Sequence, residues 1–395
     1  MSEFRTIREL CSVVVDCPHS TPKWTANGKI VIRNNNIKHG RIDFSSPSYT
    51  DDEHFAQRIK RAKPQPGDII ITREAPIGDV GMIPENTECC LGQRMVLLRA
   101  NQSVCDNFYL LYSLQSLYVQ HQISWSEGTG TTVSNLRIPH LEQIQIPYLP
   151  LEQQAKISSV LRALEEKIEN NRRLNDNLEQ QAQSYFQELF VDNADPEWTT
   201  GTISDLGAVV GGSTPSKAKP EYYTESGIAW ITPKDLSINK SKFVSHGEND
   251  ITELGLKNSS AAIMPEGTVL FSSRAPIGYI AIAAGEVTTN QGFKSVVPKP
   301  EIGTPFVYFF LKNTLPVIEG MASGSTFKEV SGSTMKNVPA VIPDAETLAK
   351  FSDFCAPIFA QQRILEEQNQ SLATLRDNLL PKLMSGEIDV SAVQL

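Results

Sequence analysis

The longest regular pattern in the chain is a stripe of apolar residues, recurring every three or four positions, after Pro150 and again after Pro343. Such spacing predicts two long amphipathic helices that bury their stripes against each other, as in a coiled coil. Residues 151–190 contain no glycine or proline, and a helix of about forty residues would extend roughly 60 Å. Polar residues interrupt the first stripe at Asn171 and Asn175, so the first helix is not a plain leucine zipper. The stripe residues are Ile157, Leu161, Leu164, Ile168 and Leu178 in the first helix and Phe351, Phe354, Ile358, Leu365, Leu372, Leu375 and Leu379 in the second.

The rest of the chain is rich in glycine, proline and short apolar runs. Turn residues bound these runs, which predicts short strands at residues 69–72, 95–98, 269–271 and 279–282. Longer apolar segments predict one helix at residues 107–124 and one at residues 305–318. The expected fold class outside the long helices is therefore mixed α+β.

An internal repeat organises the whole sequence. Thr72–Gly78 (TREAPIG) returns as Ser272–Gly278 (SSRAPIG), an offset of 200 residues. Gly92-Gln93-Arg94 pairs with Gly292-Phe293-Lys294 at the same offset, and Ser20-Thr21-Pro22 resembles Ser213-Thr214-Pro215 nearer the start of each copy. Each copy is about 195 residues long. This is far longer than a solenoid repeat, so each copy should be a complete structural unit.

Charge is distributed unevenly over the 395 residues. The net charge is −9, yet residues 1–150 and residues 201–343 each carry equal numbers of basic and acidic side chains. All the excess acid lies on the predicted long helices and their flanks. The balanced segments can therefore still form local positive faces, although solvated surface lysines and arginines are the plain alternative. The basic clusters are Arg33, Lys38 and Arg41; Arg58, Lys60, Arg61 and Lys63; and Lys234, Lys240 and Lys242.

Several kinds of chemistry lack their motifs. The sequence has no phosphate-binding G-x-x-x-x-G-K-[ST] loop, no Asn-Pro-Pro-aromatic methyltransferase motif and no G-x-G-x-x-G turn after a strand. It also lacks H-E-x-x-H and C-x-x-C, so we expect neither a metal site nor catalysis by this chain alone. The six cysteines are irregularly spaced, and no apolar stretch resembles an export signal or a membrane span. We therefore expect a cytoplasmic protein with reduced thiols.

The order of several phrases resembles the specificity subunit of type I restriction–modification systems, over essentially the whole chain. The phrases are Arg73–Gly78 (REAPIG), Ser273–Gly278 (SRAPIG), Trp230–Asp235 (WITPKD), Pro150–Gln154 (PLEQQ), Asn290–Lys294 (NQGFK) and Arg376–Ile388 (RDNLLPKLMSGEI). Individually, A-P-I-G is a weak signal, and the strength lies in the number of phrases and their order.

The resemblance implies an α+β protein with two similar target-recognition domains in tandem, separated by two long antiparallel coiled-coil-like helices. The corresponding ranges here are 1–150 and 193–343 for the domains, with 151–192 and 344–395 for the helices and the C-terminal tail. It implies that each domain reads one half of a split double-stranded DNA site and that the helices set the spacing. Two methyltransferase subunits and translocating restriction subunits would be the protein partners. S-adenosylmethionine and ATP with Mg²⁺ would belong to those partners, so we expect no cofactor in this chain.

Candidate base-reading residues follow from the chemistry of base edges, because Arg or Lys suits guanine and Asn or Gln suits adenine. A turn is the alternative role for the asparagine run, an internal ion pair for the basic residues, and a plain loop for the Gly-Thr-rich segments. Packing is the favoured interpretation of Trp24, Trp125 and Trp230. The candidates are Arg33, Asn34, Asn35, Arg73, Gln93, Arg94, Thr131 and Thr132 in the first copy and Lys234, Arg274, Asn290, Gln291, Lys294, Ser325, Thr326 and Lys328 in the second.

Two rival functions remain open at this stage. One is a protein-only scaffold whose globular halves bind other proteins. The other is an autonomous DNA-modifying enzyme, which the missing motifs disfavour. Since the two copies have diverged, a DNA-reading protein of this plan should recognise an asymmetric, bipartite target.

Overall fold

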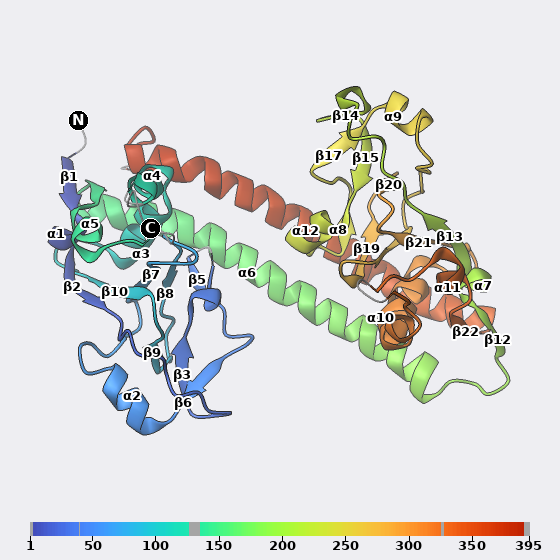
Figure 1. The fold of residues 1–395 in the computed structure, drawn as a ribbon, viewed down its shortest axis with the longest axis horizontal. Coiled ribbons are helices and arrows are strands. Elements are labelled where there is room, and N and C mark those ends of the chain that lie inside the picture. The colour runs from blue at the N-terminus through green and yellow to red at the C-terminus, as the bar shows by residue number, and fades with distance from the viewer. Residues whose placement is uncertain (1–2, 39, 126–134, 325–327, 391–395) are drawn as a thin grey trace. The chain divides into compact units, whose positions relative to one another are not determined.

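The computed structural model describes residues 3–38, 40–125, 135–324 and 328–390 of the chain. It divides into two compact units, Met1–Ile168 with Ser371–Leu395, and Glu169–Gln370. Each unit therefore contains one globular copy of the repeat and one end of both long helices (Figure 1).

The first unit is built on a four-stranded sheet in the order β2-β10-β7-β8, with a three-stranded sheet in the order β6-β3-β9. In the second sheet β3 pairs with β6 antiparallel and with β9 parallel. The strands of this unit are β1 (Glu3–Thr6), β2 (Cys11–Asp16), β3 (Lys29–Ile32), β4 (Ile37–Lys38), β5 (Arg41–Ile42), β6 (Ser48–Thr50), β7 (Ile69–Thr72), β8 (Val80–Met82), β9 (Cys89–Leu91), β10 (Met95–Ala100) and β11 (Gln145–Tyr148). Its short helices are α1 (Ile7–Leu10), α2 (Asp52–Arg58), α3 (Asn107–Gln115), α4 (Leu117–Trp125) and α5 (Ile138–Gln143).

The second unit repeats this plan with a five-stranded sheet, β13-β21-β18-β19-β16, and a four-stranded sheet, β14-β17-β15-β20. Here β15 takes the place of β3, since it pairs with β17 antiparallel and with β20 parallel. The strands are β12 (Thr199–Thr202), β13 (Gly207–Gly211), β14 (Tyr223–Thr224), β15 (Ile228–Ile231), β16 (Phe243–Val244), β17 (Asn249–Ile251), β18 (Val269–Ser273), β19 (Ile277–Ala283), β20 (Thr288–Thr289), β21 (Lys294–Pro298) and β22 (Pro339–Ile342). The short helices are α7 (Ile203–Leu206), α8 (Pro233–Ile238), α9 (Glu253–Lys257), α10 (Thr304–Gly320) and α11 (Gly332–Lys336).

The sequence repeat is thus a structural repeat. The order β2-β10-β7-β8 in one unit matches β13-β21-β18-β19 in the other. Even an unusual backbone geometry recurs, because Ala75 and Ala275 have positive φ angles of 45° and 50° in the repeated turn. The predicted strands at residues 69–72, 95–98, 269–271 and 279–282 are confirmed as β7, β10, β18 and β19.

One helix prediction is wrong and its counterpart is confirmed. Residues 107–124 form two helices rather than one, because Ser116 adopts an extended conformation (φ −64°, ψ 146°) between α3 and α4. The Ser116 hydroxyl accepts a hydrogen bond from the backbone N–H of Val119 at 3.4 Å, as a capping serine does. In the second unit the corresponding segment is the single helix α10, which continues through Pro316.

The two long helices are α6 (Leu151–Gln187), which ends in a π-helical turn at Glu188–Asp192, and α12 (Ala345–Ser385). In the second unit, Asn171 of α6 donates to Asn369 of α12 at 3.0 Å, and Asn175 of α6 donates to Glu366 of α12 at 3.2 Å. A later residue of α6 thus contacts an earlier residue of α12. The helices are therefore antiparallel there. The two asparagines that interrupt the apolar stripe make polar contacts across the pair, and this explains why the stripe is broken.

Each unit has its own core around its larger sheet. In the first, α3 packs on β10 and β8, and the core reaches Ile157 and Leu161 of α6 and Leu383 and Met384 of α12. In the second, α10 packs on β18, β19 and β21, and the core includes Phe186 of α6 and Phe351 of α12. The apolar faces of both helices are thus part of the globular cores.

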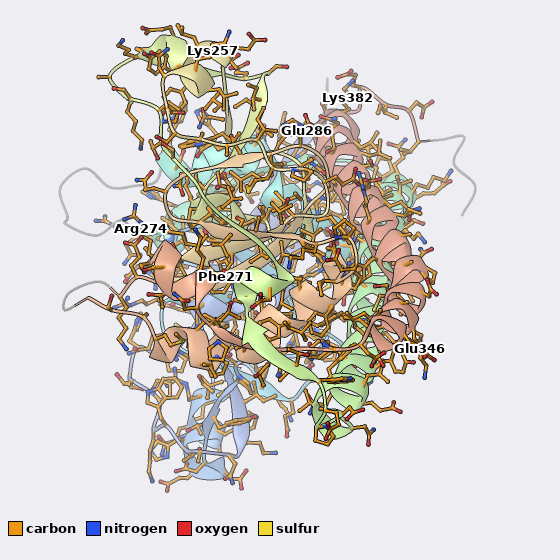
Figure 2. All side chains as sticks on the ribbon, turned by 90° about the vertical axis from the view of Figure 1, so that its right-hand side faces the viewer. Lys257, Phe271, Arg274, Glu286, Glu346 and Lys382 are labelled. Atoms are coloured by element: carbon orange, nitrogen blue, oxygen red, sulfur yellow. The ribbon has the colours of Figure 1, made fainter. Side chains whose placement is uncertain are left out.

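Figure 2 labels a buried and an exposed side chain of the second unit. Phe271 is fully buried in β18, and the side chain of Lys257 is 73% exposed.

Candidate nucleic-acid interface

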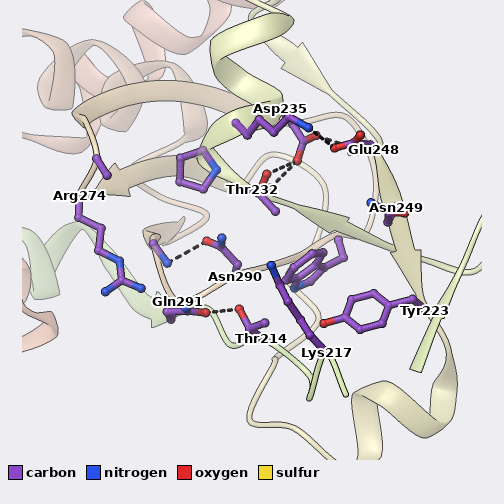
Figure 3. A pocket seen from close by; sticks show the side chains of 15 residues that line it. Thr214, Lys217, Tyr223, Thr232, Asp235, Glu248, Asn249, Arg274, Asn290 and Gln291 are labelled. Atoms are coloured by element: carbon purple, nitrogen blue, oxygen red, sulfur yellow. Dashed lines mark hydrogen bonds and ion pairs between the residues drawn. The ribbon is translucent and has the colours of Figure 1, made fainter. Parts of the chain in front are cut away.

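The second unit contains a cavity of about 700 Å³ at the ends of β15 and β18 (Figure 3). Four of the candidate residues predicted from sequence line it, namely Lys234, Arg274, Asn290 and Gln291. The complete lining is Thr214, Lys217, Tyr223, Trp230, Thr232, Pro233, Lys234, Asp235, Glu248, Asn249, Arg274, Ala275, Asn290, Gln291 and Gly292. The tertiary structure therefore brings together, in one cavity, residues that are spread over more than 70 positions of the sequence.

The wall that follows β15 is held by a capping box. Thr232 is the N-cap of α8, and Asp235 accepts hydrogen bonds from its backbone N–H at 2.7 Å and from its hydroxyl at 2.6 Å. The other carboxylate oxygen of Asp235 accepts from the backbone N–H of Glu248 at 2.9 Å. Lys234 lies between these anchored residues and donates to Glu248 at 2.6 Å, and this hydrogen bond raises the pKa of Lys234. The turn thus presents an exposed ammonium and a carboxylate side by side on a fixed backbone.

The opposite wall carries two amides and a guanidinium. The side-chain oxygen of Asn290 accepts from the backbone N–H of Gly292 at 2.8 Å, so its NH₂ group remains the one able to donate to a ligand. The side-chain oxygen of Gln291 accepts from the Thr214 hydroxyl. Arg274 lies across the hollow from Tyr223 in Figure 3 and approaches Glu329 at 3.5 Å. These are the side-chain types that bind base edges and phosphates.

Lys294 and Lys328 are not among the residues that line the cavity. Lys294 approaches Glu329 at 3.8 Å, and burial lowers the pKa of Lys294 against the opposing effect of that carboxylate. Lys328 is exposed. Ser325 and Thr326, together with Thr131 and Thr132 of the first copy, fall outside the residues that the structure describes.

The first unit holds its asparagine run by the same cap. The side chain of Asn36 accepts from the backbone N–H of Arg33 at 2.9 Å, as Asp235 does from Thr232. Arg33 therefore corresponds to Thr232, and Asn35 to Lys234. Arg33 and Asn35 are exposed, whereas the Asn34 side chain donates to the carbonyl of Glu74 at 2.6 Å. Asn34 thus joins the asparagine run to the repeated Ala-Pro-Ile-Gly turn.

The remaining candidates of the first copy surround that turn. Arg73 is only 11% exposed and binds Asp16 at 2.8 Å and the carbonyl of Leu136 at 2.8 Å, so it fills the internal ion-pair role. Arg94 is 56% exposed and approaches Glu74 at 3.4 Å. Gln93 donates to the carbonyl of His19. Of the candidates around the turn, Arg94 is the one that presents a largely exposed cation.

The family model for the type I restriction modification DNA specificity domain matches the chain twice, at residues 3–180 and 196–375. The chain belongs to this family. The two matches coincide with the two copies of the repeat, which makes each globular copy with its following helix one specificity domain.

Curated relatives support the same assignment. The MjaIX specificity subunit of Methanocaldococcus jannaschii is 39% identical over 191 residues, covering 46% of this chain and 44% of that protein. The alignment thus spans less than half of the relative's length. The putative MjaX specificity subunit of the same organism is 21% identical over 411 residues, covering 98% of this chain and 94% of the relative.

A solved structure shows the same fold. The S subunit of a type I restriction-modification system from M. genitalium matches with a TM-score of 0.61 at 19% identity, over 97% of this chain and 96% of that one. At this level of identity the match establishes the architecture.

Two basic residues of the specificity domains differ from their expected exposure. Arg58 is 7% exposed and donates to four backbone carbonyls, those of Pro18, Ser20, Leu91 and Gly92. Lys242 is also 7% exposed. Neither contributes to an exposed positive face, because each satisfies its charge within the protein.

The tryptophans divide between packing and exposure. Trp230 is 6% exposed and its indole N–H donates to the carbonyl of Ser213 at 3.0 Å, which confirms a packing role for most of its ring. Trp125 is 78% exposed and Trp24 is 46% exposed, so the packing interpretation is wrong for Trp125 and holds for only part of Trp24. The Arg33 guanidinium lies 5.3 Å from the Trp24 ring.

The cavity residues that were not singled out from sequence as DNA-contacting include Thr214, Lys217, Tyr223, Glu248 and Asn249. For Thr214 a signal existed, because Ser213-Thr214-Pro215 repeats Ser20-Thr21-Pro22. Lys217 lies in a turn and Tyr223 in β14, in a stretch with no counterpart phrase, and the backbone N–H of Glu248 is bound by Asp235. Among the described residues, no group of three or more His, Cys, Asp and Glu side chains is arranged to hold a metal ion. Within the same ranges, no helix combines the length and the apolar character needed to cross a membrane.

Proposed function

We propose that the chain is the DNA-recognition subunit of a type I restriction–modification complex, and that each specificity domain reads one half of an asymmetric bipartite site. The observation that carries the proposal is the double match to the specificity-domain family in two diverged copies. In this proposal the chain itself is not an enzyme and acts in the cytoplasm.

The cavity of the second unit supports base reading by its composition. It offers two lysines and an arginine, which suit guanine and phosphate, and three amides, which suit adenine. Of its two carboxylates, Asp235 is occupied by the capping box, and Glu248 is the kind of group that accepts a hydrogen bond from cytosine. The matching position of Lys234 in the first copy is Asn35, so the two half-sites should differ.

The charge distribution supports a requirement for partners. Phosphate contacts supply much of the affinity for DNA, and both globular copies are electrically balanced. We therefore expect weak DNA binding by the isolated chain. In the proposal, methyltransferase subunits dock on the long helices and supply cationic surface, and restriction subunits join the larger complex. S-adenosylmethionine and ATP with Mg²⁺ are assigned to those partners.

Selection of bound fragments from random duplex DNA tests the proposal. The chain, purified with its methyltransferase subunit, should enrich a split motif with an unread spacer of constant length. Failure to enrich any motif in the presence of the partner would favour a protein-only scaffold. DNA methylation or cleavage by the chain alone, with cofactors supplied, would instead establish an autonomous enzyme.

A further inference from the structure

Residues 232–242, the recognition segment of the second domain, carry Lys234 and are attached to the long helices at their far end. The segment leaves β15 of the four-stranded sheet at Thr232, forms α8 beside the cavity, and reaches the five-stranded sheet at Lys242, whose carbonyl accepts from the backbone N–H of Ile282 in β19 at 2.7 Å. Only seven residues separate Lys234 from Lys242. Lys242 and the cavity wall are therefore joined by a short stretch of chain.

Lys242 lies in a polar and aromatic site formed by both helices. Its ammonium donates to Glu179 of α6 at 2.8 Å and to Gln362 of α12 at 2.8 Å. The same nitrogen is 3.4 Å from the ring centroid of Phe359 and 4.4 Å from that of Tyr308. Carboxylate, amide and aromatic faces thus enclose a single buried cation.

The backbone beside Lys242 is held as well. Glu366 of α12 accepts from the N–H of Lys242 at 2.8 Å and from the N–H of Phe243 at 3.0 Å. The carboxylate of Glu179 also accepts hydrogen bonds from the Lys312 ammonium at 2.5 Å and from the Tyr308 hydroxyl at 3.1 Å. The end of the recognition segment is therefore fixed by side chain and by main chain to both helices.

The first specificity domain has a related contact. Its recognition segment leaves β3 of the three-stranded sheet at Arg33 and reaches the four-stranded sheet at Gly40, whose carbonyl accepts from the backbone N–H of Met82 in β8 at 3.2 Å. The next residue, Arg41, donates to the carbonyl of Glu165 in α6 at 3.0 Å, and the Glu165 carboxylate accepts from Tyr112 at 3.0 Å. Both copies thus place a cation against the long helix α6, within one residue of the point where the segment reaches the larger sheet.

Stability alone does not explain a buried lysine at this place. A buried ion pair is often no more stabilising than well-packed apolar residues, and its best-attested use is to fix one arrangement among several. Lys242 is surrounded by rings that would accept an apolar side chain. The directional bonds of the ammonium add something that apolar packing lacks, which is a fixed position along the helices.

We propose that Arg41 and Lys242 are positioning residues, each of which holds the recognition segment of its own domain against α6 and so fixes where that segment meets the bases. The inference rests on the proposed function and assigns to each half-site its own anchor. Lys242 governs the half-site read by the second domain, and Arg41 governs the half-site read by the first.

The test uses the complete complex with its methyltransferase subunits and a panel of duplexes that carry single-base changes in each half-site. Lys242→Met keeps an unbranched, apolar-compatible side chain and leaves Glu179 paired with Lys312. We expect discrimination against wrong bases in the second half-site to fall about tenfold, which is the size of a typical single mismatch effect, with the first half-site unchanged. Lys242→Arg should retain discrimination better than Lys242→Met. Arg41→Met should give the reciprocal result.

Matched controls remove the same charge from the same segments at exposed positions. These are Lys240→Met and Lys38→Met, both at exposed residues. A general loss of folding would lower methylation of all duplexes together and leave base discrimination intact. Equal behaviour of Lys242→Met and Lys240→Met, or a uniform loss at both half-sites, would overturn the positioning role. Failure of the unaltered complex to select a split motif would instead overturn the proposed function.

Discussion

At the scale of single residues, a buried charge cluster joins Lys242 of the second unit to both long helices. Burial opposes the ionisation of Glu179, yet Lys242 and Lys312 outweigh it and lower the pKa of Glu179 to about 2. Burial also lowers the pKa of Lys242 to about 8, against the opposing effect of Glu179. The carboxylate is therefore the member of the cluster that holds the cations in place near neutral pH.

Replacing Glu179 by Gln should destabilise the second unit by about 3–5 kcal/mol at pH 7, because two cations lose their buried partner. The folded-state pKa of Glu179 lies below its ordinary value, so its contribution is present above about pH 4.5 and is lost as pH falls toward 2. The difference in stability between the unaltered chain and the variant should therefore shrink over that range. Urea denaturation, monitored by hydrogen exchange of peptides from residues 169–370, measures this difference in the free energy of unfolding. Glu253→Gln, which removes an exposed pair with Lys257, is the control and should change stability by less than about 1 kcal/mol. A pH-independent difference would contradict the role assigned to Glu179.

At the scale of elements, the two long helices combine apolar packing with polar pairs that define their alignment. Asn171 and Asn175 contact α12, and a polar pair in a helix interface favours one register over others. Both α6 and α12 run from one compact unit into the other. Their length should therefore control the separation of the two half-sites.

Inserting one heptad after Ile168 in α6 and a matching heptad before Ser371 in α12 should lengthen the unread spacer. Seven helical residues add about 10 Å, which corresponds to about three base pairs of DNA. The half-site sequences should stay the same, because neither globular copy is altered. Mapping of methylated sites in cells that carry the variant measures the spacer, and an unchanged spacer would exclude the helices as its determinant.

At the scale of the whole molecule, the chain is a duplication whose copies share a topology but differ in the residues they present. The cap that places Lys234 in the second copy places Asn35 in the first. Such divergence on a shared framework is typical of proteins that present different binding residues on one fold.

Exchanging residues 1–150 for the same segment of another specificity subunit should change one half-site and leave the other intact. The reason is that the second domain and its cavity are built from residues 169–370 alone. Methylome mapping of the chimaera distinguishes the outcomes. Alteration of both half-sites would show that the domains do not read DNA independently.

The repeat, the α+β class, the two long helices and the family could all be predicted from the sequence, because each leaves a local or periodic trace. Apolar spacing marks the helices, and the A-P-I-G turn marks the two copies at an offset of 200 residues. The break at Ser116 left no such trace, since serine is tolerated within helices and only its extended backbone and capping contact end α3.

The tertiary structure decided which polar residues face a ligand and which serve the fold. Arg73 and Arg274 both precede the repeated Ala-Pro-Ile-Gly turn, one position apart in the repeat, yet Arg73 is held by Asp16 and Leu136 while Arg274 lines the cavity. Lys242 resembles its exposed neighbour Lys240 in sequence, but Glu179, Gln362 and the aromatic rings enclose it. The exposure and pairing of a charge depend on residues that folding brings close. Gln362, for example, lies more than a hundred positions from Lys242 in the sequence. Local sequence patterns therefore determined the elements and the repeat, and long-range packing alone determined the site.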